Sequence, residues 1–313
     1  TTEIAIGRKT KLSPTRAYGN IDKRFAFIGP ISFIIPVIIL PYYCVIGGWV
    51  IKYVTVFATG QDMAAADSLF FANFIGQEYA PLVFFFIFLG LTALIVVLGV
   101  EKGIEKVSKY LMPVLILLAI VICIYIMFIP GAGAGIKYYL LPDFSKFSFK
   151  TVCAAMGQMF YSLSIAMGIL ITFGSYMKKD TSIEKSTENV EIFDTAIAIM
   201  AGLMIIPAVF AFSGGNAETL KSGPALMFIT IPKVFANMGF GTAIGVVFFL
   251  LVLFAAVTSS IALTESAVST FEDELHWSRK KSTVFMGMVM LLLGTLSCLG
   301  YGPLANFKIL GMQ

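Results

Sequence analysis

Hydrophobic residues in this chain form long unbroken runs, and polar residues are concentrated in the segments between them. Two of these runs, Pro81–Val100 and Tyr110–Ile129, contain almost no polar residue. A helix needs about 20 apolar residues to cross the hydrocarbon core of a bilayer, whereas the strands of a membrane barrel would alternate polar and apolar positions. The pattern therefore predicts membrane-spanning α-helices.

Hydropathy along the whole chain predicts seven such spans. Their expected limits are residues 24–58, 81–100, 110–130, 150–176, 189–212, 241–272 and 283–300. Residues 101–109 are expected to form a short amphipathic linker. Glycines and prolines interrupt residues 213–240, which are expected to form a long loop with helical pieces. The predicted fold class is an all-α polytopic membrane protein, with residues 1–313 forming one transmembrane domain.

Composition agrees with this class. Of the 313 residues, 58% are hydrophobic and only 13% are charged, whereas soluble proteins carry about 25% charged residues. The lipid bilayer is thus the expected environment, and nucleic acid is not an expected partner. The four cysteines have neither metal-ligand spacing nor the pattern of a disulfide framework, which favours a packing role for them.

Basic residues distinguish the two sides of the predicted membrane region. Of the 22 lysines and arginines, 15 lie before or at the start of the first span and after the second, fourth and sixth spans. Cytoplasmic loops carry an excess of Lys and Arg, so residues 1–23 are expected in the cytoplasm and the loop at 213–240 outside the cell. The chain begins without Met and stops just past a loop, which predicts an internal fragment truncated at both ends.

A group of hydroxyl residues interrupts the sixth predicted span. Ala255, Thr258 and Ser259 recur at i, i+3 and i+4 and share one face of a helix. Hydroxyl and carbonyl oxygens at mid-membrane depth could replace the water shell of a hard cation. The hydroxyls could instead bond to carbonyls one turn earlier or join two helices. The spacing by itself favours this second, structural alternative.

The fourth predicted span is unusually polar at its centre. An amide, a phenol and two hydroxyls lie between Gln158 and Ala166. An unwound turn here would free carbonyl and N–H groups to bind ions and a substrate carboxylate. No proline forces a break, and Gly157 and Gly168 only permit one. The residues by themselves therefore favour a polar seam between two continuous helices.

Two carboxylates and a tyrosine also lie in predicted spans. Asp194 stands among apolar residues, where a charge costs about 2.5–3.5 kcal/mol on insertion scales. Its expected partner is a cation, unless it lies close enough to the membrane surface to reach water. Glu265 is nearer the cytoplasm, and a structural or gating role is expected. Tyr43 needs a partner for its hydroxyl, either a substrate carboxylate or a carbonyl of another helix.

Six motifs follow one another over essentially the whole chain. They are Glu3–Arg8, Tyr42-Tyr43 with Trp49, Gly157–Ser164, Ser222–Phe228, Thr258–Ser260, and Glu272–Glu274 followed by Ser278–Lys280. In this order the chain resembles the neurotransmitter:sodium symporters, in particular their bacterial amino-acid transporters. The resemblance implies part of a five-plus-five inverted-repeat fold with broken helices. The seven spans would be family helices 3 to 9, and the first helix, with half of each ion site, would lie outside the chain.

The resemblance also assigns roles to individual residues. It implies one sodium site with Ala255, Thr258 and Ser259, and a second with Ser162 and Asp194. It implies an amino-acid site lined by Ile39, Tyr43, Tyr161, Ser162, Ser164, Ala166, Met167, Ser259 and Leu263. In this site Tyr43 would bind the substrate carboxylate and Tyr161 would close the outer gate. Because Met167 and Leu263 are apolar and adaptable, a hydrophobic or aromatic amino acid is the expected substrate.

The same resemblance bears on the ions. Sodium is the expected co-transported ion. Gln158 and Ser162 resemble half of the chloride site of animal relatives, but Ala198 stands where chloride-dependent relatives have Ser. Chloride dependence is therefore not expected, since Asp194 would itself supply the negative charge.

The expected function is sodium-coupled symport of an amino acid across the plasma membrane, the inner membrane of a bacterium, by alternating access. Two alternatives remain open: proton coupling through Asp194 or Glu265, and a receptor-like protein that binds an amino acid without transporting it. An enzyme is not expected, because the predicted spans contain neither a nucleophile–base pair nor a cluster of metal ligands. The sequence does not predict an oligomeric state.

Overall fold

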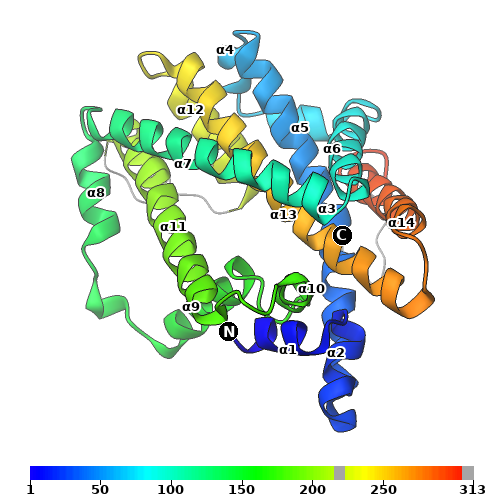
Figure 1. Ribbon diagram of the computed structural model, residues 1–313. Helices are drawn as coiled ribbons and strands as arrows, with labels where there is room; N and C mark the ends of the chain where they lie inside the picture. Colours follow the sequence, from blue (N-terminus) through cyan, green and yellow to red (C-terminus); the bar gives the residue numbers. More distant parts are fainter. Residues whose placement is uncertain (215–222, 305–313) are drawn as a thin grey trace.

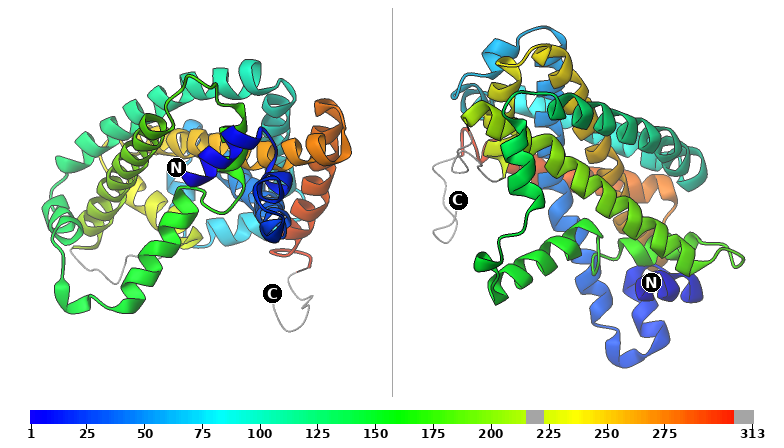
Figure 2. Two further views of the ribbon diagram at one scale, coloured as in Figure 1. Left: turned by 60° about the horizontal axis from the view of Figure 1, so that its bottom comes forward. Right: turned by 90° about the vertical axis from the view of Figure 1, so that its left-hand side faces the viewer.

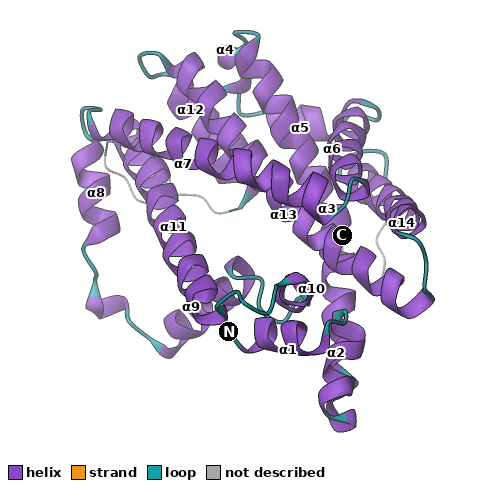
Figure 3. Cartoon of the chain, in the orientation of Figure 1, coloured by secondary structure: helices purple, strands orange, loops and turns teal. Residues whose placement is uncertain are grey.

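The computed structural model describes residues 1–214 and 223–304 of the chain. Every regular element in these two ranges is a helix, with turns and loops between the helices (Figure 3). The prediction of an all-α protein is therefore confirmed. Residues 215–222 of the predicted loop, and with them Ser222 of the fourth motif, lie outside the described residues.

Six of the described helices are long and apolar enough to cross a membrane. They are α3 (Ile28–Ala58), α6 (Ala80–Val97), α7 (Lys106–Met127), α11 (Ile183–Ser213), α13 (Gly241–Leu275) and α14 (Arg279–Leu299). Each coincides with a predicted span, although the ends differ by a few residues. For example, α11 begins at residue 183 rather than 189, because the Ser182 side chain accepts a hydrogen bond from the Lys185 N–H and caps the helix earlier.

The remaining predicted span, residues 150–176, is divided into two helices. These are α9 (Phe149–Ser162) and α10 (Ile169–Tyr176). Between them Ser164 and Ala166 have φ angles of 55° and 64°, and Gly168 has φ 74°, a left-handed conformation that does not continue a right-handed helix. The continuous polar seam that the residues favoured is therefore wrong, and the broken helix agrees with the resemblance.

Short helices connect the long ones. Before α3 lie α1 (Thr2–Thr10), α2 (Pro14–Ile21) and η1 (Lys23–Phe25), and after it α4 (Asp62–Ala65) and α5 (Phe70–Ile75). Further along are η2 (Val100–Glu105), α8 (Ala132–Leu140), η3 (Phe144–Lys146), η5 (Leu226–Thr230) and α12 (Ile231–Ala236). The predicted linker is thus a π-helical turn that leads directly into α7, and the predicted loop after α11 does contain helical pieces.

Glycines allow the central helices to approach closely. A Cβ at Gly48 of α3 would lie 2.7 Å from the Phe85 nitrogen of α6, and one at Gly245 of α13 would lie 2.1 Å from the Phe57 ring of α3. Small residues favour close helix packing in membranes because the hydrophobic effect does not drive helices together there. As a result α3 packs against α13 and α6, and α14 packs against α3 and α6.

The remaining helices lie beside this group and at its two ends, and α6 and α14 form one edge of the molecule (Figures 1 and 2). α1 packs along α10, and α11 packs against α7 and α8. The N-terminus lies near the break between α9 and α10 in both further views of the molecule. α9 buries none of its residues, so the segment that leads into the break stands at the edge of the bundle.

Candidate functional site

A cavity of about 700 Å³ lies where α3, α11 and α13 face the break between α9 and α10. It brings together residues that are more than 200 positions apart in the sequence, from Ile39 to Leu263. The residues of the predicted sites that line it are Ile39, Tyr43, Tyr161, Ser162, Ser164, Met167, Asp194, Thr258, Ser259 and Leu263. Of the residues predicted to bind substrate, Ala166 is the one that does not line it.

One wall of the cavity carries a carboxylate and a hydroxyl. The Ser162 hydroxyl, at the end of α9, donates a hydrogen bond of 2.7 Å to Asp194 Oδ1 in α11. Asp194 lies eleven residues inside α11, which is about 16 Å along the helix axis. The Asp194 carboxylate therefore has a hydrogen-bond partner at the break. Its place among apolar residues does not require that it reach water at the membrane surface.

Two hydroxyl residues of α13, Thr258 and Ser259, also line the cavity. The Thr258 hydroxyl lies within hydrogen-bonding distance of the carbonyls of Ala255 (3.0 Å) and Phe254 (3.2 Å), so the bonding one turn back that the spacing favoured is present. A hydroxyl that donates its proton keeps its lone pairs. Back-bonding therefore leaves Thr258, which lines the cavity, able to bind a cation.

The Ser260 side chain points away from the cavity that Thr258 and Ser259 line. It is fully buried, and its hydroxyl lies 2.9 Å from the Thr92 hydroxyl of α6 rather than in the cavity. The hydroxyl run of α13 thus divides by helix face. Thr258 and Ser259 face the cavity, whereas Ser260 joins two helices, which is the structural role considered for the whole group.

The remaining lining residues combine one phenol with an apolar surface. The Tyr43 side chain lies close enough to that of Ser259 to interact with it, and both line the cavity. Phe173 of α10 adds an aromatic wall that sequence reasoning missed, since it occurs in an ordinary apolar run. Gln158 also lines the cavity, whereas Ala198 does not.

Ala166, which does not line the cavity, contacts α1 through its backbone N–H. Its N–H donates a hydrogen bond of 2.8 Å to Glu3 Oε1 of α1, and the second oxygen, Oε2, is buried without a hydrogen-bond partner among the described residues. Burial raises the pKa of the Glu3 carboxyl, and the Ala166 N–H lowers it to a smaller extent. Sequence reasoning missed this contact, although Glu3 belongs to the first motif.

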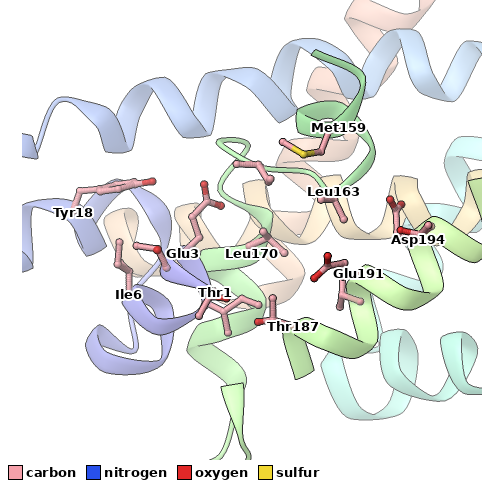
Figure 4. A pocket seen from close by; sticks show the side chains of 15 residues that line it. Thr1, Glu3, Ile6, Tyr18, Met159, Leu163, Leu170, Thr187, Glu191 and Asp194 are labelled. Carbon is pink, nitrogen blue, oxygen red and sulfur yellow. The ribbon is translucent and has the colours of Figure 1, made fainter. Parts of the chain in front are cut away.

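A second cavity of about 630 Å³ adjoins the first (Figure 4). It lies between α1, the break and α11, and the carboxylates of Glu3, Glu191 and Asp194 line it. Asp194 lines both cavities. No group of three or more His, Cys, Asp or Glu side chains in the described ranges is arranged to hold a metal ion, so the three carboxylates do not form such a site.

Glu265 of α13 lies outside both cavities, although it follows the lining residue Leu263 by only two positions. It is fully buried, and the Arg279 guanidinium donates to both of its oxygens, at 3.0 and 2.5 Å. The Tyr176 hydroxyl donates a third hydrogen bond of 2.6 Å to Oε1. Sequence reasoning missed Tyr176. It included Arg279 among the basic residues and in the sixth motif but did not pair it with Glu265.

Comparison with known proteins gives three findings. A family model described as the sodium:neurotransmitter symporter family matches residues 72–311. An uncharacterized sodium-dependent transporter of Bacillus subtilis, YhdH, is 32% identical over 99% of this chain and 69% of its own length. An uncharacterized sodium-dependent transporter of Haemophilus influenzae is also 32% identical, over 99% of this chain and 70% of its own length.

The structure also has a solved relative. The crystal structure of MhsT in complex with L-phenylalanine matches with a TM-score of 0.87 and 36% sequence identity. The match covers 98% of this chain and 70% of that chain. The arrangement of the helices is therefore similar to that in a solved amino-acid complex.

Proposed function

Because the chain belongs to the sodium:neurotransmitter symporter family, we propose that it couples the movement of sodium ions to that of a hydrophobic or aromatic amino acid across the plasma membrane. It is a multi-pass membrane protein of a transporter family and, as the sequence predicts, not an enzyme. Residues 1–23 would lie in the cytoplasm and the loop at 213–240 outside.

The single observation that carries the proposal is the shared cavity. Thr258 and Ser259 of α13, the Ser162–Asp194 pair and Tyr43 of α3 all line the same space of about 700 Å³. Hydroxyl, carbonyl and carboxylate oxygens are the ligands that hard cations prefer. The cavity is within the size range of small-molecule sites, so it has room for a substrate beside such ions.

Two sodium ions would use different oxygens. One would bind the Thr258 and Ser259 hydroxyls with the Ala255 carbonyl, which Thr258 already contacts. The other would bind Asp194 and Ser162. Because Asp194 brings a full negative charge to this second site, we propose that transport does not require chloride. The family resemblance implies a further helix that would complete both coordination shells.

The amino acid would lie between these ions. Tyr43 is placed to donate its hydroxyl proton to the substrate carboxylate. Met167, Leu263 and Phe173 belong to the apolar part of the lining, which suits a large hydrophobic or aromatic side chain. The complex of MhsT with L-phenylalanine supports an aromatic substrate here.

Coupling would follow from the break between α9 and α10. A sodium ion at Ser162 and Asp194 would hold the end of α9 against α11 and thereby fix the backbone of residues 163–168 beside the substrate. Sodium would then raise the affinity for the amino acid, and the amino acid would raise the affinity for sodium equally. The membrane potential would add about 2.3 kcal/mol per charge for every 100 mV.

Uptake by the full-length protein in proteoliposomes tests the sodium site. We expect Thr258→Val with Ser259→Ala to abolish sodium-dependent uptake of labelled phenylalanine, because the cavity then loses two oxygens. Ser260→Ala is the matched control, since Ser260 is buried against Thr92, and it should retain sodium dependence. Unchanged sodium dependence of the double variant would refute the assignment.

Proton coupling is the second candidate. Glu265 is already held by Arg279 and Tyr176, which leaves Asp194 as the carboxylate that could carry a proton through the cavity. Uptake driven by a pH gradient in the absence of sodium would favour this mechanism. Saturable binding of phenylalanine without entry into the vesicles would instead favour a receptor-like protein.

A further inference from the structure

A groove of about 340 Å³ lies at the junction of α13 and α14, apart from both cavities described above. One end of the groove is basic and includes Lys280 and Lys281. The other end is apolar and includes Val284 and Met288, and Trp277 lies between the two helices. The groove therefore changes from charged to apolar along the first turns of α14, a helix long enough to cross the membrane.

The basic end has charges that no neighbour compensates. Lys280 and Lys281 are exposed, and among the described residues neither forms an ion pair with a carboxylate. The acidic residues nearby are already engaged: Glu265 and Glu272 with Arg279, and Glu274 with Arg16. Asp273 accepts the Ser13 N–H.

Trp277 positions one of these charges. The Lys281 ammonium lies 4.1 Å from the centre of the Trp277 ring, a distance typical of a cation–π contact. Trp residues gather at the membrane–water interface, and Lys side chains lay their methylene groups along apolar surface while the ammonium reaches the polar region. Trp277 and the two lysines thus mark the level of the phospholipid headgroups.

The apolar end continues into an exposed apolar surface of α14. The side chains of Val284 and Met288 are 51% and 56% exposed, and Leu292 one turn further along α14 is 61% exposed. These residues recur every four positions and form one continuous apolar stripe on the helix. An acyl chain that starts in the groove can therefore follow α14 into the membrane.

We propose that this groove binds an anionic phospholipid, with its phosphate on Lys280 and Lys281 and one acyl chain along Val284 and Met288. The uncompensated charge selects an anionic headgroup over a neutral one, and a basic side chain near an anionic lipid surface contributes about a fivefold gain in affinity. A soluble anion would leave the apolar half of the groove unused. The occupant we infer is therefore a lipid molecule.

Native mass spectrometry of the full-length protein tests this proposal. With equal amounts of phosphatidylglycerol and phosphatidylethanolamine added to the micelles, we expect phosphatidylglycerol adducts to predominate. Lys280→Gln with Lys281→Gln should weaken phosphatidylglycerol binding about 30-fold, since two lysines are lost. Lys178→Gln with Lys179→Gln, an exposed basic pair outside the groove, is the matched control and should bind as the wild type does.

A photoreactive phosphatidylglycerol then locates the lipid. We expect crosslinks to map to residues 277–288 and to disappear in the variant of Lys280 and Lys281 but not in the control pair. Equal binding of the two phospholipids, equal losses in the two variants, or crosslinks confined to other segments would each overturn the proposal. A thermal unfolding transition that matches the wild type would show that a loss of binding is not a loss of fold.

Discussion

The two oxygens of Glu3 have very different surroundings. Oε1 accepts the Ala166 N–H at 2.8 Å, whereas Oε2 is buried and has no hydrogen-bond partner in the described part of the chain. A buried unpaired charge is unfavourable, which is why burial raises the pKa of this carboxyl. Glu3 therefore holds the broken segment in place through one oxygen while the other opposes ionisation.

This arrangement predicts a pH dependence of stability. Burial raises the pKa of Glu3 above its ordinary value of 4.5 in the folded state. Above this pH the folded protein holds more protons than the unfolded chain, so stability falls as the pH rises through the folded-state pKa. Glu3→Gln removes the titration. We expect the variant to become more stable relative to the wild type as the pH rises above the ordinary carboxyl pKa and through the raised pKa of Glu3.

Thermal unfolding of the full-length protein in detergent, followed at several pH values, measures this difference. Glu191→Gln, which changes a carboxylate of the same cavity that has no such buried contact, is the control. A difference between wild type and Glu3→Gln that stays constant with pH would mean that Oε2 has a partner in the complete transporter.

At the residue scale, the sequence predicted which types of side chain the cavity contains. It did not predict which of several adjacent side chains point into the cavity. Thr258, Ser259 and Ser260 are adjacent and chemically alike, yet the first two line the cavity and the third bonds to Thr92. A helix turns by about 100° per residue, so the face of each hydroxyl depends on which neighbour the helix packs against. That neighbour is known only from the fold.

At the scale of elements, the long helices could be predicted from the residues themselves, whereas the break was implied only by the family resemblance. The spans follow from the length of the apolar runs, and the six long helices lie where these runs occur. The break depends on Ser164 and Ala166, which adopt a left-handed conformation that Ser and Ala disfavour. Tertiary contacts, such as the hydrogen bond from the Ala166 N–H to Glu3, stabilise this conformation. No local sequence pattern predicts such contacts.

The left-handed conformation of Ala166 predicts that a glycine at this position changes the stability of the protein. A left-handed conformation costs a residue other than glycine about 1–2 kcal/mol. A glycine in place of alanine increases the conformational entropy of the unfolded chain, which lowers stability by about 0.4–1 kcal/mol. We expect Ala166→Gly to raise the free energy of unfolding by about 0.5–1 kcal/mol, the balance of these two terms. Chemical denaturation of the full-length protein in micelles measures it.

Ala155, in the middle of α9, is the matched control. The same substitution in a regular helix should lower the free energy of unfolding by about 0.5–1 kcal/mol. The two substitutions are thus expected to act in opposite directions. Equal destabilisation by both would mean that the left-handed conformation at Ala166 is not kept in the complete transporter.

At the scale of the whole molecule, one group of side chains ties three helices together away from the substrate cavity. Glu265 of α13 accepts hydrogen bonds from Arg279 of α14 and from Tyr176 of α10. α10 is also the helix that follows the break. We propose that α10 moves during transport and that the Tyr176–Glu265 hydrogen bond then breaks, so that this group holds one end of the transport path closed.

Tyr176→Phe tests this role while it keeps the size and the ring of the side chain. The hydrogen bond that it removes ends on a charged group, and such bonds contribute about 1.5–3 kcal/mol. If the bond exists only when this end is closed, its loss shifts the balance toward the open form by at least about tenfold. We therefore expect the affinity for phenylalanine at saturating sodium to fall by up to about the same factor, because less of the protein is in the binding-competent state.

Binding of labelled phenylalanine to the full-length protein measures the change, and Tyr110→Phe is the control because Tyr110 is 65% exposed on α7. Labelling of Ser269→Cys gives a second readout, since Ser269 is 7% exposed and faces Thr172 of α10. The thiol should react faster when Tyr176→Phe is added, because the opening of α10 uncovers it. An affinity loss without faster labelling would place the effect of Tyr176 in the cavity rather than in closure, whereas both changes together would connect Glu265 to the alternation of access.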